Sequence, residues 1–153
     1  MGQIGVISDT HGLLRPQAVE ALRSSALIIH AGDVGRPEIL DELRRIAPVI
    51  AVRGNVDRDA WAESLPLSEI VEHDDVRLYV LHILEDLDLD PPTAGFHAVI
   101  TGHTHRPKME TKEGVLYFNP GSAGPRRFDL PVSLGRISIN DGRLVGELVY
   151  LQV

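Results

Sequence analysis

Residues 3–11 read QIGVISDTH, an apolar run that ends abruptly in polar residues. Residues 3–8 have the length and composition of a buried strand. Residues 16–24 (PQAVEALRS) begin with proline and have the pattern of a helix. The same order then recurs, with strands predicted at residues 27–31 and 49–52 and a helix at 37–46. Alternation of strands and helices at this spacing predicts βαβ units with parallel strand pairing.

The second half of the chain has a different pattern, with short apolar runs separated by turn residues. Residues 68–72 and 76–82 form a predicted hairpin, and residues 98–101 form another buried run. Two further hairpins are predicted around turns, 108–112 with 115–119 and 132–139 with 143–150. We therefore expect an α/β sandwich with mixed sheets, as a single domain over residues 1–153. The stretch PPTAG, residues 91–95, is expected to be a loop within this domain.

Composition and charge exclude several classes of protein. The formal net charge of −7 argues against stable nucleic-acid binding, which depends on a basic surface. The chain has no cysteine, so it has neither disulfides nor thiolate metal ligands. No apolar run approaches the roughly 20 residues of a membrane helix, and the first residues lack the pattern of a signal peptide. We expect a cytoplasmic protein with no membrane association; the sequence does not indicate an oligomeric state.

Polar side chains follow five of the predicted strands, at the edge of an α/β sheet where ligands usually bind. In ITGHTHRP, residues 100–107, the two histidines stand two residues apart, which puts them on the same side of an extended segment. The candidate metal ligands from all five segments are Asp9, His11, Asp33, Asn55, His82, His103 and His105.

This set is too large for one tetrahedral zinc ion, which takes four ligands. It suits two divalent ions that share a bridging carboxylate and a bridging water. Two such ions would make the pocket positive and attract a phosphate ester to an acidic protein. We expect manganese first, and the oxygen and nitrogen ligands also fit nickel, iron, cobalt, zinc or magnesium.

The order of the motifs resembles a known family. The motifs follow one another in this order: D-x-H at residues 9–11 (Asp9 to His11), G-D at 32–33, G-N-x-D at 54–57, an isolated His82, G-H-T-H at 102–105 and N-P-G-S at 119–122. This series is similar to that of the calcineurin-like metallophosphoesterases, in their small single-domain bacterial and archaeal branch. The resemblance covers nearly the whole chain and implies a four-layer sandwich of two mixed sheets flanked by helices.

The resemblance also implies roles for the candidate residues. One ion would be held by Asp9, His11, Asp33 and His105, and the other by Asp33, Asn55, His82 and His103, with Asp33 bridging. A hydroxide between the ions would attack phosphorus in line, and the metals and Asn55 would stabilise the developing charge. Asp33, Asn55 and His103 are accordingly the expected catalytic residues.

Two positions depart from the family pattern. Val56 stands where larger members have a histidine near the leaving group. Since valine cannot donate a proton, we expect a preference for substrates with good leaving groups. Ile83 follows His82 where the family usually has glycine, so His82 is the least secure ligand.

Other polar residues have structural explanations as good as functional ones. His30 is expected to be a hydrogen-bonded core residue, and Asp57 fits either an orienting group or a turn carboxylate. Asn119 to Ser122 could pack under the ligands, but a plain turn is favoured. The acidic run at residues 86–90 lacks the glycine and glutamate of a calcium loop and predicts a solvated loop. Four arginines are candidates for binding substrate phosphate, with Arg36 the one assigned alongside Asn55; the others are Arg53, Arg126 and Arg127.

The expected function is that of a dinuclear metal-dependent phosphodiesterase acting on a small phosphate ester. The alternative is a non-catalytic protein-interaction module on the same fold, as in a eukaryotic retromer subunit. The complete set of ligand types favours the enzyme. Hydrolysis of another kind of ester at the same site is a third possibility that the motifs leave open.

Overall fold

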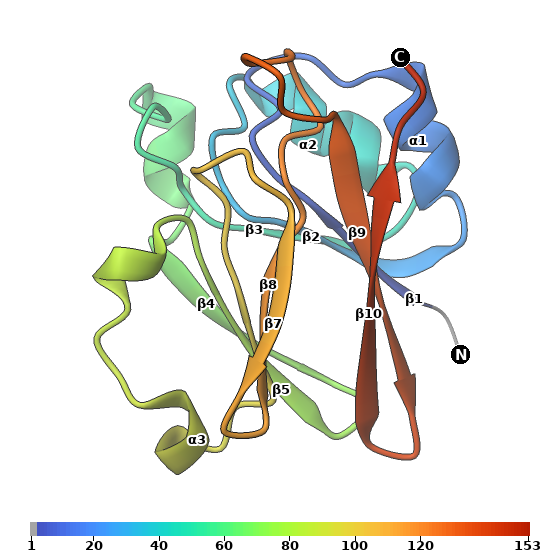
Figure 1. Ribbon diagram of the computed structural model, residues 1–153. Helices are drawn as coiled ribbons and strands as arrows, with labels where there is room; N and C mark the ends of the chain where they lie inside the picture. Colours follow the sequence, from blue (N-terminus) through green and yellow to red (C-terminus); the bar gives the residue numbers. More distant parts are fainter. Residues whose placement is uncertain (1–2) are drawn as a thin grey trace.

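Two five-stranded sheets pack face to face in the computed structural model, which describes residues 3–153 (Figure 1). The first sheet contains β1 (Gln3–Ile7), β2 (Ser25–His30), β3 (Val49–Ala51), β9 (Ser133–Asn140) and β10 (Arg143–Tyr150). Its strand order is β10-β9-β1-β2-β3. The pairs β1–β2 and β2–β3 are parallel, while β9 runs antiparallel to both β1 and β10. The sheet is therefore mixed, as expected.

The second sheet is also mixed and has the order β4-β5-β6-β8-β7. Its strands are β4 (Ser68–His73), β5 (Val76–Leu81), β6 (Ala98–Ile100), β7 (Lys108–Lys112) and β8 (Val115–Asn119). The central pairs β5–β6 and β6–β8 are parallel, and both edge strands are antiparallel to their neighbours.

The three predicted hairpins form around two-residue turns in which both residues have positive φ. These turns are Asp74-Asp75, Glu113-Gly114 and Asp141-Gly142. This is the backbone of the type I′ turn, whose twist matches that of the strands it joins. The turn chemistry therefore accounts for the hairpins in the second half of the chain.

Three apolar layers hold the sandwich together. The main core lies between the sheets, where β1, β2, β5 and β6 contribute fully buried side chains such as Ile4, Ile29, Leu78 and Ile100. A second core joins the outer face of the first sheet to α1 (Pro16–Leu22) and α2 (Pro37–Arg44). A smaller third core covers the outer face of the second sheet.

The layer over the second sheet is thinner than the helical layer over the first. It is built from η2 (Leu84–Asp86), α3 (Pro91–Ala94) and the chain between them, which packs apolar side chains onto Tyr79 and Val99. The loop prediction for residues 91–95 is wrong in part, because Pro91 starts a single helical turn that ends at Gly95, where φ is 83°. A further 3₁₀ turn, η1 (Ala60–Ser64), was not predicted.

Within residues 3–153, no helix is long and apolar enough to cross a bilayer.

Candidate metal centre

The loops that follow β1, β2, β3, β5 and β6 bring the predicted ligands together at one edge of the sandwich. Backbone hydrogen bonds tie the loops to each other: the amide of Asp9 donates to Gly32 O and that of His11 to Asp33 O, both at 3.0 Å. The amide of Gly102 likewise donates to His82 O at 3.0 Å. The loop after β1 is therefore bonded to the loop after β2, and the loop after β5 to the loop after β6.

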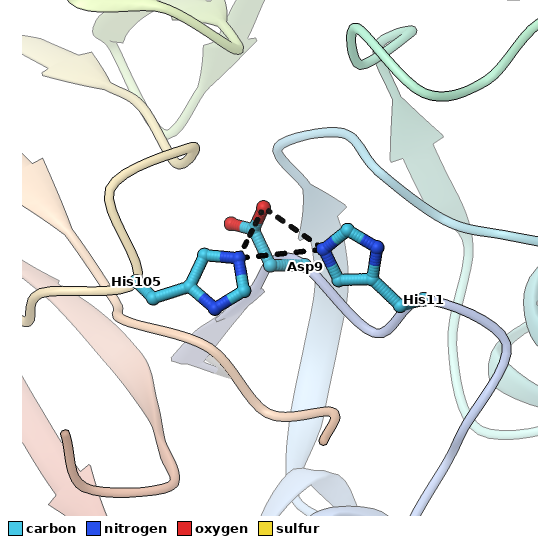
Figure 2. A group of neighbouring side chains, drawn as sticks. All are labelled: Asp9, His11 and His105. Atoms are coloured by element: carbon cyan, nitrogen blue, oxygen red, sulfur yellow. Dashed lines mark hydrogen bonds and ion pairs between the residues drawn. The ribbon is translucent and has the colours of Figure 1, made fainter. Parts of the chain in front are cut away.

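Asp9, His11 and His105 form the first group of side chains, which Figure 2 shows converging on one point. The Nε2 atoms of His11 and His105 are 3.3 Å apart. Oδ1 of Asp9 lies 3.4 Å from His105 Nε2 and 3.7 Å from His11 Nε2. We refer to these three residues as the inner group, because Asp9 is fully buried and His105 is 2% exposed.

The two oxygens of Asp9 have different surroundings. Oδ2 accepts hydrogen bonds from the Ser8 hydroxyl at 2.7 Å and from the His103 amide at 3.0 Å. Oδ1 is buried and accepts no hydrogen bond, although imidazole nitrogens face it. Burial alone would raise the pKa of Asp9, but the imidazoles of His105 and His11 hold that pKa well below its usual value.

Asp33, His82 and His103 form the second group, with Asn55 beside it. His82 Nε2 lies 3.1 Å from Asp33 Oδ2, and His103 Nδ1 lies 3.2 Å from Asn55 Oδ1. We refer to these four residues as the outer group, because Asn55 is exposed and His103 is partly exposed.

Asp33 faces both groups. Its Oδ1 accepts the backbone amide of Val56 at 3.0 Å. Its Oδ2 lies 3.1 Å from His82 Nε2 and 3.7 Å from His11 Nε2. Burial would raise the pKa of Asp33, but the hydrogen bonds from His82 and Val56 keep that pKa below its usual value.

His82 is oriented from behind. Its Nδ1 lies 2.7 Å from the carbonyl oxygen of Ala31, so Nδ1 carries the proton and donates it, and Nε2 points at the carboxylates. Such a contact is typical of histidines that bind metals. Burial would lower the pKa of His82, but Asp33 and Asp9 raise that pKa above its usual value. The two carboxylates therefore favour a positive charge at this position.

The donor atoms fit divalent ions. Two ligand atoms that each lie about 2.1 Å from one tetrahedral ion are about 3.4 Å apart. The inner group has edges of 3.3, 3.4 and 3.7 Å. The buried Asp9 Oδ1 without a hydrogen bond is a further indication of a cation position. The geometry thus supports metal binding by oxygen and nitrogen ligands, as the sequence predicted.

Five of the predicted ligands have a strained backbone. The φ angles are 55° at Asp9, 46° at His11, 58° at Asp33, 74° at His103 and 63° at His105. Left-handed conformations of residues other than glycine cost on the order of 1–3 kcal/mol each and tend to cluster at functional sites. This was not foreseen from the sequence, although aspartate and histidine are among the residues that tolerate positive φ best.

Two glycines leave room for the ligand carboxylates. A Cβ atom on Gly54 would lie 2.1 Å from Asp33 Oδ1, and one on Gly102 would lie 2.7 Å from Asp9 Oδ2. Both distances are far below a normal contact. The glycines of the G-N-x-D and G-H-T-H motifs are therefore required by packing against Asp33 and Asp9.

Asp57 is an orienting group. Its Oδ2 accepts the amides of Gly54 and Val34 at 2.9 and 3.1 Å, and its Oδ1 accepts the amide of Gly35 at 3.0 Å. These bonds join the loop that carries Asn55 to the loop that carries Asp33. The sequence left this role open beside that of a turn carboxylate.

The N-P-G-S segment is more than a turn, so the favoured prediction for it is wrong. The Asn119 amide nitrogen donates to Gly102 O at 2.9 Å and to Thr104 Oγ1 at 3.1 Å. The Ser122 hydroxyl donates to Asp9 O at 3.0 Å. The segment therefore packs beneath the loop that carries Asp9 and the loop that carries His103 and His105, and it holds these two loops in place.

His30 is a buried core residue, which confirms the prediction. Its Nδ1 accepts the amide of Gly32 at 3.1 Å, so Nε2 carries the proton and donates to Thr10 Oγ1 at 3.0 Å. The Thr10 hydroxyl in turn donates to Val34 O at 2.8 Å. Burial lowers the pKa of His30 to about 4, so the ring is neutral beneath the site.

Arg36 lies at the rim of the site rather than inside it. Its Nε donates to Gly12 O at 2.9 Å, and its guanidinium lies 3.9 Å from Glu38. Arg126 and Arg127 are exposed, and Arg53 is half-buried. Asp86, Asp88 and Asp90 are exposed, as expected for a solvated acidic loop.

The sequence profile of the calcineurin-like phosphoesterase superfamily domain matches residues 3–142. The chain belongs to this family. A probable metallophosphoesterase from Methanothermobacter thermautotrophicus is 40% identical over 150 residues, covering 88% of this chain and 85% of that protein. The ligand groups and the relatives together support a metal-binding phosphoesterase.

Solved structures of the calcineurin-like fold superpose over almost all of the chain. An archaeal phosphodiesterase has a TM-score of 0.79 at 25% identity, covering 96% of this chain and 99% of that one. Vps29 from Chaetomium thermophilum has a TM-score of 0.77 at 20% identity, covering 98% and 96%. These matches confirm the predicted fold of two mixed sheets, and the likeness to Vps29 concerns the fold alone.

Proposed function

We propose that this calcineurin-like protein is a phosphodiesterase that works as a single domain with two divalent ions, one in each ligand group. The observation that carries the proposal is the position of Asp33 Oδ2, which faces His82 in the outer group and His11 in the inner group. A carboxylate oxygen shared in this way fits a bridging ligand. The phosphodiesterase assignment is supported by the similarity to the archaeal phosphodiesterase.

The donor set assigns the ligands as follows. The inner ion would be held by Asp9, His11, Asp33 and His105, and the outer ion by Asp33, Asn55, His82 and His103. When bound, two such ions supply a nucleophilic oxygen at neutral pH and positive charge for the phosphoryl oxygens. Manganese is the ion we favour.

The chain's own residues bind and orient the ester. The exposed Asn55 amide is free to donate a hydrogen bond to a phosphoryl oxygen and so stabilises charge in the transition state. His103, 3.2 Å from Asn55 Oδ1, lies on the same open side. Arg36, at the rim beside Gly12, is a candidate for contacting a distal oxygen of the substrate.

Val56 limits what the enzyme can hydrolyse well. Its side chain is 47% exposed beside Asn55 and provides no proton for a leaving group. We therefore expect faster hydrolysis of a p-nitrophenyl diester than of an alkyl diester. Comparable rates on the two would contradict this reading of Val56.

The decisive assay uses metal-stripped protein with bis-p-nitrophenyl phosphate. Added Mn²⁺, Ni²⁺, Mg²⁺ or Zn²⁺ should restore hydrolysis in the wild type and not in Asp33→Ala. Asp41→Ala is the matched control, because Asp41 is an exposed helix residue paired with Arg44. Full activity of Asp33→Ala would refute the bridging role of Asp33, and no hydrolysis with any of the metals would favour the interaction module instead.

A further inference from the structure

A cavity of about 530 Å³ begins at the outer group and extends away from the metal centre. Gly102, His103 and Thr104 line its inner end, and Leu84, Leu87 and Tyr117 line an apolar wall. A volume of this size suits a small organic group. We refer to it as the basic cavity, because three cationic side chains, Arg106, Lys108 and Lys112, also line it.

The basic cavity has an excess of positive charge. Lys108 and Lys112 both face a single oxygen of Glu110, at 3.4 and 3.7 Å. The Arg106 side chain is exposed and forms no ion pair with any of residues 3–153. Glu85 is the only other carboxylate among the lining residues of the described chain. An arginine that is free beside a partly neutralised lysine pair is suited to an anion.

A second cavity of about 510 Å³ lies on the other side of the outer group, where Asn55 and His82 line it. The segment after β5 separates the two, because Ile83, Asp86 and Asp88 line the second cavity while Leu84, Glu85 and Leu87 line the basic one. The second cavity has two carboxylates against one arginine, Arg53. An anionic group is therefore directed to the basic cavity.

We propose that the basic cavity is a subsite for one arm of the diester, an arm that carries a flat or apolar ring and a second negative charge. The inference rests on the proposed function, since the reacting phosphate must be at the metal centre for an arm to reach past His103. The ring packs on Leu84, which is 40% exposed, and on Leu87, and the second anion pairs with Arg106. Arg106 is thus a residue that determines specificity.

Three p-nitrophenyl diesters with the same leaving group test this subsite. Their second arms are methyl, thymidine 5′-yl, and thymidine 5′-yl with a 3′-phosphate. The wild type should prefer the doubly charged arm to methyl by about tenfold or more in kcat/KM, through KM. In Arg106→Gln this preference should fall about tenfold, and in Arg45→Gln, an arginine at the end of α2, it should stay unchanged.

Direct binding separates this inference from the proposed function. In calorimetry of the manganese-loaded proteins, thymidine 3′,5′-bisphosphate should bind the wild type about tenfold more tightly than it binds Arg106→Gln. It should bind Arg45→Gln as tightly as it binds the wild type. Equal affinity for wild type and Arg106→Gln, or equal kcat/KM for all three diesters, would overturn the subsite. Arg106-dependent binding without release of nitrophenol from any diester would sustain the subsite and refute the phosphodiesterase.

Discussion

The inner and outer ligand groups differ in how far they are closed to solvent. In the inner group, Asp9 is fully buried and His105 is 2% exposed, and the His103 amide and the Ser8 hydroxyl hold Asp9 from behind. In the outer group, Asn55 is exposed and both neighbouring cavities begin at its members. For the two proposed ions, this difference predicts a division of labour, in which the inner ion would be held tightly and the outer ion would meet the substrate.

Removing one histidine from each group should give the largest effects. His105→Ala should lower kcat/KM for bis-p-nitrophenyl phosphate by roughly 10³-fold, and His103→Ala by roughly 10²-fold, because only the second leaves the buried ion intact. Mass spectrometry of the metals should find one tightly held ion in His103→Ala. If His105→Ala retains a tightly held ion and His103→Ala does not, the outer group holds its ion more tightly than the inner group, which would contradict this account.

The glycines beside the carboxylates should give the next largest effects. Gly102→Ala displaces Asp9 and Gly54→Ala displaces Asp33, and a shift of about 1 Å can cost 10²-fold in rate. Gly95→Ala is the control, because Gly95 lies at the end of α3, away from the carboxylates, and has the positive φ that Gly54 and Gly102 lack. It should lower the melting temperature without lowering kcat/KM. Equal loss of activity in all three variants would point to general backbone strain.

Asp57→Ala should weaken the outer group more than the inner one. It leaves three backbone amides of the β2 and β3 loops without their acceptor, which should lower the free energy of unfolding by about 3 kcal/mol. Urea denaturation of the metal-free protein measures this loss. Asp41→Ala, which removes an exposed carboxylate, should change the free energy of unfolding by less than about 0.5 kcal/mol. A metal titration in which Asp57→Ala weakens both ions equally would contradict the local role.

The effect of His30, beneath the inner group, is confined to acidic pH. Its pKa is about 4 in the folded protein and 6.5 without the fold. The unfolded chain therefore binds the extra proton between these values, and the free energy of unfolding should fall on acidification from pH 6.5 to 4, by on the order of 1 kcal/mol per pH unit. The raised pKa of His82 changes the free energy of unfolding only above pH 6.5. The lowered pKa values of Asp9 and Asp33 change it only below pH 4. Urea titrations of metal-free wild type and His30→Asn should differ in slope only within that window.

Much of the fold could be predicted because local patterns determine it. The ranges predicted for β7, β8 and β10 agree with the structure, since two-residue turns bound them. The helical turn of α3 was missed because Pro91-Pro92 and Gly95 indicate a turn equally well. Its position depends on packing against Tyr79 and Val99, strand residues that the local sequence does not reveal.

The side chains of the candidate site could be predicted from the sequence, but the hydrogen bonds that hold its loops in place could not. Residue types and their order indicated Asp9, Asp33 and the histidines, because donors that follow adjacent strands converge. The roles of Asp57 and Asn119 depend on which backbone amides and carbonyls lie within reach, and only the folded chain determines this. The positive φ angles likewise arise from the loops being tied together.

Anomalous diffraction from crystals soaked in Mn²⁺ tests the two-ion arrangement most directly. We predict two peaks that share Asp33, one surrounded by Asp9, His11 and His105 and the other by Asn55, His82 and His103. The inner peak should retain higher occupancy after a brief soak in chelator, because Asp9 and His105 are buried whereas Asn55 is exposed. A single peak, or two peaks that do not share Asp33, would contradict the account.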